Sequence, residues 1–281
     1  MGKTLLSFGY GYSAQALASL LGGWRMIGTS RTAGKRVQNG IERVQFPGED
    51  MGQHLDAATH LLISAGPDQE GDPVLRELRD EIAQRDFEWV GYLSTTGVYG
   101  DHQGGWVDED TPLTPSTRRG QWRAAAEAEW QGMNLPLHIF RIAGIYGPGR
   151  GPFSKVRAGT ARRIIKDGQV FSRIHVEDIA QVVAASIAQP NAGAVYNLCD
   201  NNPAPPQDVI GYAAELLGMP LPKAIDYNTA DMTPMARSFY AESKRVKNDR
   251  IKDELGIVLK YPDYRAGLQA LLTLEATERA F

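Results

Sequence analysis

Two glycines near the start of the chain have the spacing of a phosphate-binding loop. The stretch LLSFGYGYSAQALASLL contains the pattern GxGxxA, formed by Gly9, Gly11 and Ala14, between an apolar run and a helical pattern. In such a loop the first glycine allows a tight turn, the second lets the backbone approach a pyrophosphate, and the small third residue lets helix and strand pack closely. Backbone N–H groups of Tyr12 and Ser13 then face the phosphates. The loop therefore predicts a dinucleotide site.

The end of the second predicted strand indicates which dinucleotide is preferred. Sites for NAD place an acidic residue about 20 residues after the glycine loop, where it binds the ribose 2′-hydroxyl. Here the sequence reads Gly28-Thr29-Ser30-Arg31, without an acidic residue. Ser30 and Arg31 suit a 2′-phosphate, because arginine can bind phosphate through two hydrogen bonds. We therefore expect NADP(H) to be favoured over NAD(H). The alternative is that Arg31 is an ordinary solvated surface residue with no role in cofactor binding. Ala65 and Gly66, after the fourth strand, should line the adenosine side.

Five further segments match motifs of one enzyme family. The segment LSTTGVYGDHQGGWVDEDTPLTP resembles the extended short-chain dehydrogenase/reductase family, in its NAD-dependent epimerase/dehydratase group. Four matches follow it in order: FRIAGIYGPGR at 140–150, RIHVEDIA at 173–180, VYNLCD at 195–200 and SKRVKNDRIKDELG at 243–256. The nearest subgroup is the atypical one described as nucleoside-diphosphate-sugar epimerases. The resemblance implies a nicotinamide cofactor and a small-molecule substrate, such as a nucleotide sugar.

The family's catalytic residues are only partly matched. The family uses a Ser or Thr after the fifth strand and the Tyr and Lys of a YxxxK motif. The resemblance places Thr95 at the hydroxyl position, with Thr96 as the alternative. The motif YGxSKxxxE aligns with RGQWRAAAE at 119–127, so Arg119 stands at the Tyr position and Arg123 at the Lys position. Arg123 can still bind ribose hydroxyls, but Arg119 cannot transfer protons because its pKa is too high.

Other motif residues are candidates for the missing acid and for substrate contacts. Tyr99 is a candidate catalytic residue, and a packed tyrosine with a hydrogen-bonded hydroxyl is the alternative. His175 begins a predicted helix near the expected cleft, and a partly buried structural histidine is the alternative. The candidate substrate residues are Thr96, Tyr146, Arg150, Arg173 and His175.

A cluster of positive residues follows the last glycine-rich motif. It comprises Arg150, Lys155, Arg157, Arg162, Arg163 and Lys166. These side chains could receive the phosphates of a nucleotide sugar, or they form an ordinary solvated face. Two functions therefore stay open: an NADP-dependent oxidoreductase or epimerase of carbohydrates, and a catalytically inactive NADP(H)-binding sensor or scaffold, which the loss of the Tyr/Lys pair would explain.

The elements that position these residues follow from the hydrophobic pattern. Short apolar runs alternate with helical stretches, which is typical of βαβ units and a parallel sheet. Strands are predicted at Thr4–Phe8, Arg25–Thr29, Arg43–Phe46, His60–Ser64, Trp89–Ser94, Leu137–Arg141 and Ala194–Leu198. Helices are predicted at Gln15–Leu21, Asp72–Gln84, Arg119–Trp130, His175–Ala188, Asp208–Leu217 and Ser243–Leu255.

These elements predict an α/β fold, a Rossmann-type doubly wound parallel sheet with a smaller C-terminal α/β lobe. The dinucleotide-binding domain is expected at 1–148, completed by 175–198. Residues 149–174 and 199–281 should form the substrate-binding lobe. The stretch from Gly147 to Gly168 resembles an insertion more than a further sheet layer.

Composition narrows the function further. The 281 residues carry a net charge of −3, which disfavours a nucleic-acid partner or an anionic membrane surface. Cys199 is the only cysteine, so neither an internal disulfide nor a metal site is expected, and a cytoplasmic location fits best. Glycines interrupt the apolar N-terminus, and no membrane span is expected. Relatives often pair through two helices of each subunit, so a homodimer through Arg119–Trp130 is a further expectation.

Overall fold

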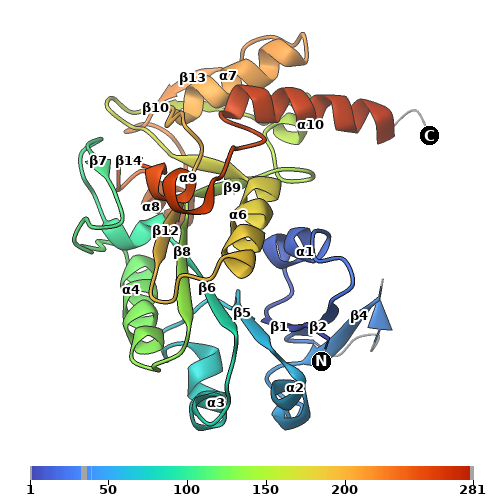
Figure 1. The fold of residues 1–281 in the computed structure, drawn as a ribbon. Coiled ribbons are helices and arrows are strands. Elements are labelled where there is room, and N and C mark those ends of the chain that lie inside the picture. The colour runs from blue at the N-terminus through green and yellow to red at the C-terminus, as the bar shows by residue number, and fades with distance from the viewer. Residues whose placement is uncertain (1, 33–36, 39, 279–281) are drawn as a thin grey trace.

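A computed structural model describes residues 2–32, 37–38 and 40–278 (Figure 1). Its centre is an eight-stranded sheet with the strand order β12-β8-β6-β5-β1-β2-β4-β3. Every neighbouring pair is parallel except β3 and β4. The strands are β1 (Thr4–Phe8), β2 (Arg25–Ser30), β3 (Val37–Gln38), β4 (Ile41–Gln45), β5 (His60–Ile63), β6 (Trp89–Thr95), β8 (Leu137–Ile142) and β12 (Val195–Leu198). The strand order reverses at β1, so the predicted doubly wound fold is confirmed.

Helices cover both faces of this sheet (Figure 1). One layer contains α1 (Tyr12–Ala18), α6 (Val176–Ala188) and α9 (Asp249–Leu255), and the other contains α2 (Gly52–Ala57), α3 (Pro73–Ala83) and α4 (Arg118–Gln131). Residues that alternate along each strand pack against one helix layer or the other, because successive side chains point to opposite faces of the sheet. Leu5 packs with the α1 and α6 layer, and Leu6 packs with the α2 to α4 layer.

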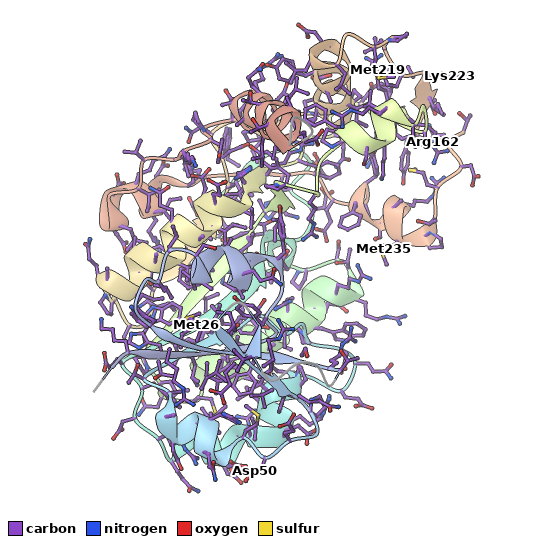
Figure 2. The ribbon with its side chains drawn as sticks, turned by 90° about the vertical axis from the view of Figure 1, so that its right-hand side faces the viewer. Met26, Asp50, Arg162, Met219, Lys223 and Met235 are labelled. Atoms are coloured by element: carbon purple, nitrogen blue, oxygen red, sulfur yellow. The ribbon has the colours of Figure 1, made fainter. Side chains whose placement is uncertain are left out.

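A smaller lobe lies beyond the carboxyl ends of the strands (Figure 1). It contains α5 (Phe153–Arg157), α7 (Pro206–Leu216), α10 (Tyr264–Glu278) and a two-stranded sheet of β10 (Arg163–Ile165) and β13 (Ala224–Asp226). Phe153, Val209 and Leu268 share its hydrophobic core. The short helix α8 (Pro234–Phe239) lies at the side of the lobe nearest α4, as Met235 marks in Figure 2.

Two short parallel ladders join the lobe to the sheet. One pairs β9 (Gly144–Tyr146) with β11 (Arg173–His175), and the other pairs β7 (Trp106–Val107) with β14 (Arg245–Val246). A 3₁₀ turn, η1 (Thr96–Tyr99), follows β6 directly. The residues after β6 and β8 are therefore held between the two parts of the molecule.

The predicted elements differ from the structure at a few places. Helix α1 begins at Tyr12, directly after Gly11, and not at residue 15. The prediction of one helix over Ser243–Leu255 is wrong in its first part, because 245–246 pair with β7 and α9 begins at Asp249. That pairing joins distant segments, so the local pattern does not show it. Helix α10 has no counterpart among the predicted helices. None of the helices that the structure describes is long and apolar enough to cross a membrane.

Candidate functional site

The glycine loop connects β1 to α1 at the point where the strand order reverses. Gly9 has φ +87°, and a Cβ there would lie 2.9 Å from the backbone nitrogen of Ala65. Its own N–H donates to the Thr29 hydroxyl at 2.9 Å. A Cβ on Gly11, by contrast, would meet nothing within 4 Å. The backbone at Gly11 is thus open to a ligand while Gly9 is packed, and this is an arrangement that fits a dinucleotide pyrophosphate.

The end of β2 holds the residues predicted to select NADP(H). Ser30 is half-buried and donates its hydroxyl to the carbonyl oxygen of Thr32 at 2.8 Å. Arg31 is exposed, and its backbone carbonyl accepts from Gln45 at 3.4 Å. Residues 33–36 lie outside the described part of the chain. Ser30 and Arg31 thus stand at the carboxyl end of β2, the strand that pairs with β1 directly before the glycine loop.

Arg123, at the family's Lys position, links the ends of two strands. Its Nη1 donates to the carbonyl oxygen of Leu93 at 2.7 Å and to the hydroxyl of Tyr92 at 3.1 Å. A Cβ on Gly66 would lie 3.2 Å from Nη2. The structure thus brings Arg123 and Gly66 together, although the sequence assigned them to different parts of the dinucleotide, the nicotinamide end and the adenosine side.

Thr95 and Thr96 lie beside the first turn of α4. The hydroxyl of Thr95 accepts from the N–H of Gly97 at 3.2 Å and caps η1, and both threonines are half-buried. A Cβ on Gly120 would lie 2.7 Å from the carbonyl oxygen of Gly97. This close approach requires a glycine in α4 and fixes the helix start against the two threonines.

Arg119, at the family's Tyr position, faces the lobe. It is exposed, and its Nη2 lies 3.9 Å from the sulfur of Met235 on α8. Figure 2 shows Met235 at the edge of the lobe. The guanidinium of Arg119 is therefore exposed beside α8 and cannot transfer a proton.

The structure contradicts a catalytic role for Tyr99. The side chain is fully buried, and its hydroxyl donates to Asn197 at 2.7 Å and accepts from Arg141 at 3.0 Å. Burial raises the pKa of the Tyr99 hydroxyl to about 12. A hydroxyl that is both buried and fully hydrogen-bonded cannot contact a substrate, so the alternative of a packed tyrosine holds.

Tyr146 and His175, which the sequence predicted to contact substrate, are buried in the structure. Tyr146 donates to the carbonyl oxygen of Asp263 at 3.4 Å and belongs to the lobe core. Nδ1 of His175 accepts from the N–H of Glu177 at 3.2 Å and caps α6, while its ring packs on Tyr261 with centroids 3.9 Å apart. Burial lowers the pKa of His175 to about 4. Both side chains hold the lobe against the sheet.

The remaining candidates for substrate contact, Arg150 and Arg173, lie in different surroundings. Arg173 donates from Nη1 to the carbonyl oxygens of Phe171 at 2.8 Å and Ala204 at 3.0 Å, and burial lowers the pKa of its guanidinium. Arg150 is exposed, with its guanidinium carbon 5.5 Å from the ring centre of Tyr12. Arg150 therefore adjoins the glycine loop, whereas Arg173 adjoins the lobe.

The predicted positive cluster is not one surface. Arg157 pairs with Glu275 at 2.5 Å, and Lys166 donates to the backbone carbonyl of Tyr240. Figure 2 shows Arg162 at the outer end of the lobe. The folded chain disperses these charges, and this argues against a single phosphate-binding patch.

Sequence reasoning missed a buried ion pair that fixes this region. Oε2 of Glu127 accepts from Nη2 of Arg141 at 2.8 Å, and both side chains are almost fully buried. Ser94 donates to the other oxygen of Glu127, so β6, α4 and β8 are tied together. The one signal for this pair in the sequence is Glu127 itself, the final Glu of the segment RGQWRAAAE that resembles the family motif.

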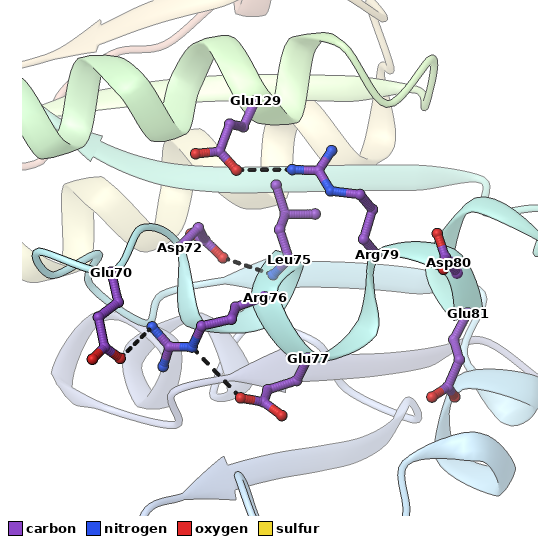
Figure 3. Close-up of a pocket in the computed structure, with 9 residues that line it drawn as sticks. All are labelled: Glu70, Asp72, Leu75, Arg76, Glu77, Arg79, Asp80, Glu81 and Glu129. Atoms are coloured by element: carbon purple, nitrogen blue, oxygen red, sulfur yellow. Dashed lines mark hydrogen bonds and ion pairs between the residues drawn. The ribbon is translucent and has the colours of Figure 1, made fainter.

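A cavity of about 530 Å³ lies away from the glycine loop, between α3 and α4 (Figure 3). It is lined by Glu70, Asp72, Leu75, Arg76, Glu77, Arg79, Asp80, Glu81 and Glu129. Arg79 pairs with Glu129 at 2.8 Å, and Arg76 pairs with Glu77 at 3.5 Å. Both arginines that line the cavity are thus paired with carboxylates, and we assign no ligand to it.

Comparison with known proteins gives the family. No family model matches the chain. Protein YeeZ of Escherichia coli K12 is 30% identical over 93% of this chain and 97% of its own length. A solved structure of a functionally unknown conserved protein from Silicibacter pomeroyi is 64% identical, covers 96% of this chain and 98% of its own, and superimposes with a TM-score of 0.92.

Solved structures of described enzymes share the fold. A protein from Methylobacillus flagellatus, described as an NAD-dependent epimerase/dehydratase, is 26% identical with a TM-score of 0.74 and covers 98% of this chain and 99% of its own. The dTDP-glucose 4,6-dehydratase of Bacillus anthracis, solved with NAD, has a TM-score of 0.78 at 18% identity, covering 100% of this chain and 98% of its own. With the sequence likeness to Protein YeeZ, the chain belongs to the extended short-chain dehydrogenase/reductase family, in its NAD-dependent epimerase/dehydratase group.

Proposed function

We propose that the chain binds a nicotinamide dinucleotide, NADP(H) in preference to NAD(H), and acts as an oxidoreductase or epimerase on a nucleotide sugar or related carbohydrate. The observation that carries the proposal is the open backbone at Gly11, set between the packed Gly9 and α1 at the switch point of the sheet. In open α/β sheets this is where dinucleotides bind. The family to which the chain belongs supports the same assignment.

Each part of the dinucleotide has a set of residues to hold it. The loop from Gly9 to Ala14, with Tyr12 and Ser13, would hold the pyrophosphate. Ser30 and Arg31 would hold the 2′-phosphate, and Ala65 with Gly66 would line the adenosine side. When bound, the dinucleotide supplies or accepts a hydride.

Arg123 and Thr95 would act at the nicotinamide end. Nη2 of Arg123, on the side of Gly66, is positioned to donate to ribose hydroxyls, because Nη1 is already held by Leu93. The hydroxyl of Thr95, beside the start of α4, would orient substrate. Arg173, at the lobe, and Thr96 would contact the remainder of the substrate.

A second candidate function is a catalytically inactive NADP(H)-binding sensor or scaffold. It is favoured by Arg119 and Arg123, neither of which can transfer a proton. The buried hydroxyls of Tyr99 and Tyr146 do not replace the missing phenol. In this case the dinucleotide would change the protein's shape or partner without any hydride transfer.

One experiment separates the two functions. The absorbance at 340 nm of the protein with NADPH or NADP+ is followed on addition of a panel of nucleotide sugars. A slow, substrate-dependent change supports the enzyme. No change for the wild type, with activity gained by the double variant Arg119→Tyr with Arg123→Lys, supports the sensor, because the rest of the site is then competent. No change in either protein contradicts the oxidoreductase proposal.

Two broader expectations belong to the same proposal. A cytoplasmic location is supported by the single cysteine, Cys199, which is buried as a free thiol. A homodimer through α4 is supported by the family's habit of pairing helices, and Gln121, Ala125 and Ala128 are exposed on this helix. Size-exclusion chromatography with light scattering gives the mass in solution, and a monomer would contradict the dimer.

A further inference from the structure

A tight turn follows β9 and projects Arg150 from the lobe side of the molecule. The N–H of Arg150 donates to the carbonyl oxygen of Gly147 at 2.9 Å, and the N–H of Gly147 donates back at 3.2 Å. Pro148 and Gly149 are the central residues, and Gly149 has φ +68°. Proline at the second position and a positive φ at the third are the requirements of a type II turn. The local sequence therefore fixes the direction in which Arg150 leaves the backbone.

The turn is docked on the glycine loop through Tyr12. The Tyr12 hydroxyl donates to the carbonyl oxygen of Pro148 at 2.9 Å, although the two residues are 136 positions apart. The guanidinium carbon of Arg150 lies 5.5 Å from the centre of the same ring, within the range of a cation–π contact. A Cβ on Gly147 would lie 2.8 Å from Val176, so the turn has no room to move toward α6.

The charge of Arg150 is not neutralised within the part of the chain that the structure describes. Its side chain is exposed and makes no ion pair there, whereas Arg157, in the same positive segment, pairs with Glu275. The ring that holds Arg150 belongs to the residue directly after Gly11. The positive charge of Arg150 is thus separated from the open backbone at Gly11 only by the side chain of Tyr12.

We infer that Arg150 binds the pyrophosphate of the dinucleotide, and that the Tyr12 ring positions it there. The inference rests on the proposed function, and it moves Arg150 from the predicted substrate residues to the cofactor residues. A guanidinium held against the glycine loop can donate two hydrogen bonds to phosphate oxygens. The lobe thereby takes part in cofactor binding through a turn that is distant in sequence from the loop.

The test compares Arg150→Gln with a matched control, Arg157→Gln, which removes a paired arginine from the same segment. Calorimetric titration measures the affinity of each for NADPH and for ADP-ribose, which contains the pyrophosphate without the nicotinamide. We expect Arg150→Gln to lower the affinity for both ligands about tenfold or more. It should also lessen the salt dependence of binding, because one charge contact is lost. Arg157→Gln should bind as the wild type does. Both should melt at the wild-type temperature within about 2 °C, since these are exposed or half-exposed positions.

Two changes at Tyr12 test the positioning. Tyr12→Phe keeps the ring and should retain most of the affinity, whereas Tyr12→Leu should lose nearly as much as Arg150→Gln. The double variant Tyr12→Leu with Arg150→Gln should lose little more than Arg150→Gln alone, because the two residues act together. If the wild type binds ADP-ribose and Arg150→Gln binds it with the same affinity, the inference about Arg150 is wrong, while the proposed function still stands. If the wild type binds neither ligand, the proposed function fails as well.

Discussion

Nη1 of Arg123 donates to the carbonyl oxygen of Leu93 at 2.7 Å, and this contact anchors one edge of its guanidinium to the end of β6. The N–H donors of a guanidinium lie in its plane and point outward along its edges, so the group can be anchored at one edge and still bind a ligand at another. The edge toward Gly66 remains available for ribose hydroxyls. The proposed function therefore gives Arg123 a binding role and no part in proton transfer.

Gly11 and Gly9 should respond differently to a side chain. Gly11→Val should fold normally, since Gly11 has φ −95° and nothing within 4 Å of its Cβ position, but should weaken dinucleotide binding by at least about tenfold. Gly9→Ala should destabilise the fold by about 1–3 kcal/mol, because its φ is +87° and its Cβ would press on Ala65. Urea denaturation and NADPH titration measure the two effects. Equal loss of stability in both variants would show that Gly11 is packed.

Glu127 should contribute far more stability than Glu129. Both carboxylates accept from an arginine at 2.8 Å, but the pair of Glu127 with Arg141 is buried, and the pair of Glu129 with Arg79 is exposed (Figure 3). Glu127→Ala leaves a buried guanidinium without its partner and should cost about 3–5 kcal/mol in the free energy of unfolding. Glu129→Ala should cost about 1 kcal/mol or less. Urea denaturation at pH 7 measures both, and similar losses would contradict this ranking.

His175 should make the protein sensitive to acid. Its pKa is about 4 in the folded protein, against about 6.5 when unfolded, so the unfolded state binds more protons between these values. Stability is therefore full above pH 6.5 and falls by about 3 kcal/mol as the pH is lowered to 4. His175→Asn keeps a cap for α6 and should lessen this slope, whatever its effect on stability at pH 7. Denaturation at several pH values compares the slopes, and an unchanged slope would place the acid sensitivity elsewhere.

Asp200 should give the stability of the protein the opposite pH dependence to that of His175. Burial raises the pKa of its carboxyl to about 7, and Oδ2 has no hydrogen-bond partner among the described residues. The folded state keeps a proton that the unfolded state releases near pH 4, so stability falls as the pH rises from about 4 to 7. Asp200→Asn should remove this loss and stabilise the protein about 3 kcal/mol more at pH 8 than at pH 5. Thermal or urea denaturation at both pH values checks the difference, and an equal effect would contradict the raised pKa.

The parts of the fold that depend on local pattern were predictable. The parallel strands of the central sheet, with α3 and α4, lie within one or two residues of their predicted bounds, because their apolar periods and caps are encoded locally, whereas the short antiparallel strand β3 was not predicted. Asp72, for example, caps α3 by accepting from the N–H groups of Val74 and Leu75.

Contacts between distant segments could not be predicted in this way. The pairing of β7 with β14 converts part of a predicted helix into a strand, and no local pattern signals it. The burial of Tyr99 depends on Asn197 and Arg141, which lie on other strands. The position of Arg150 beside Tyr12 likewise appears only in the folded chain.

The central claim is that a nicotinamide dinucleotide binds on the loop at Gly9 and Gly11. Calorimetric titration of the wild-type protein with NADPH and with NADH tests it most directly. The expected result is saturable binding of one molecule per chain, about tenfold tighter for NADPH because Arg31 would contact the 2′-phosphate, with binding weakened in Gly11→Val. The absence of saturable binding for both dinucleotides would contradict the claim.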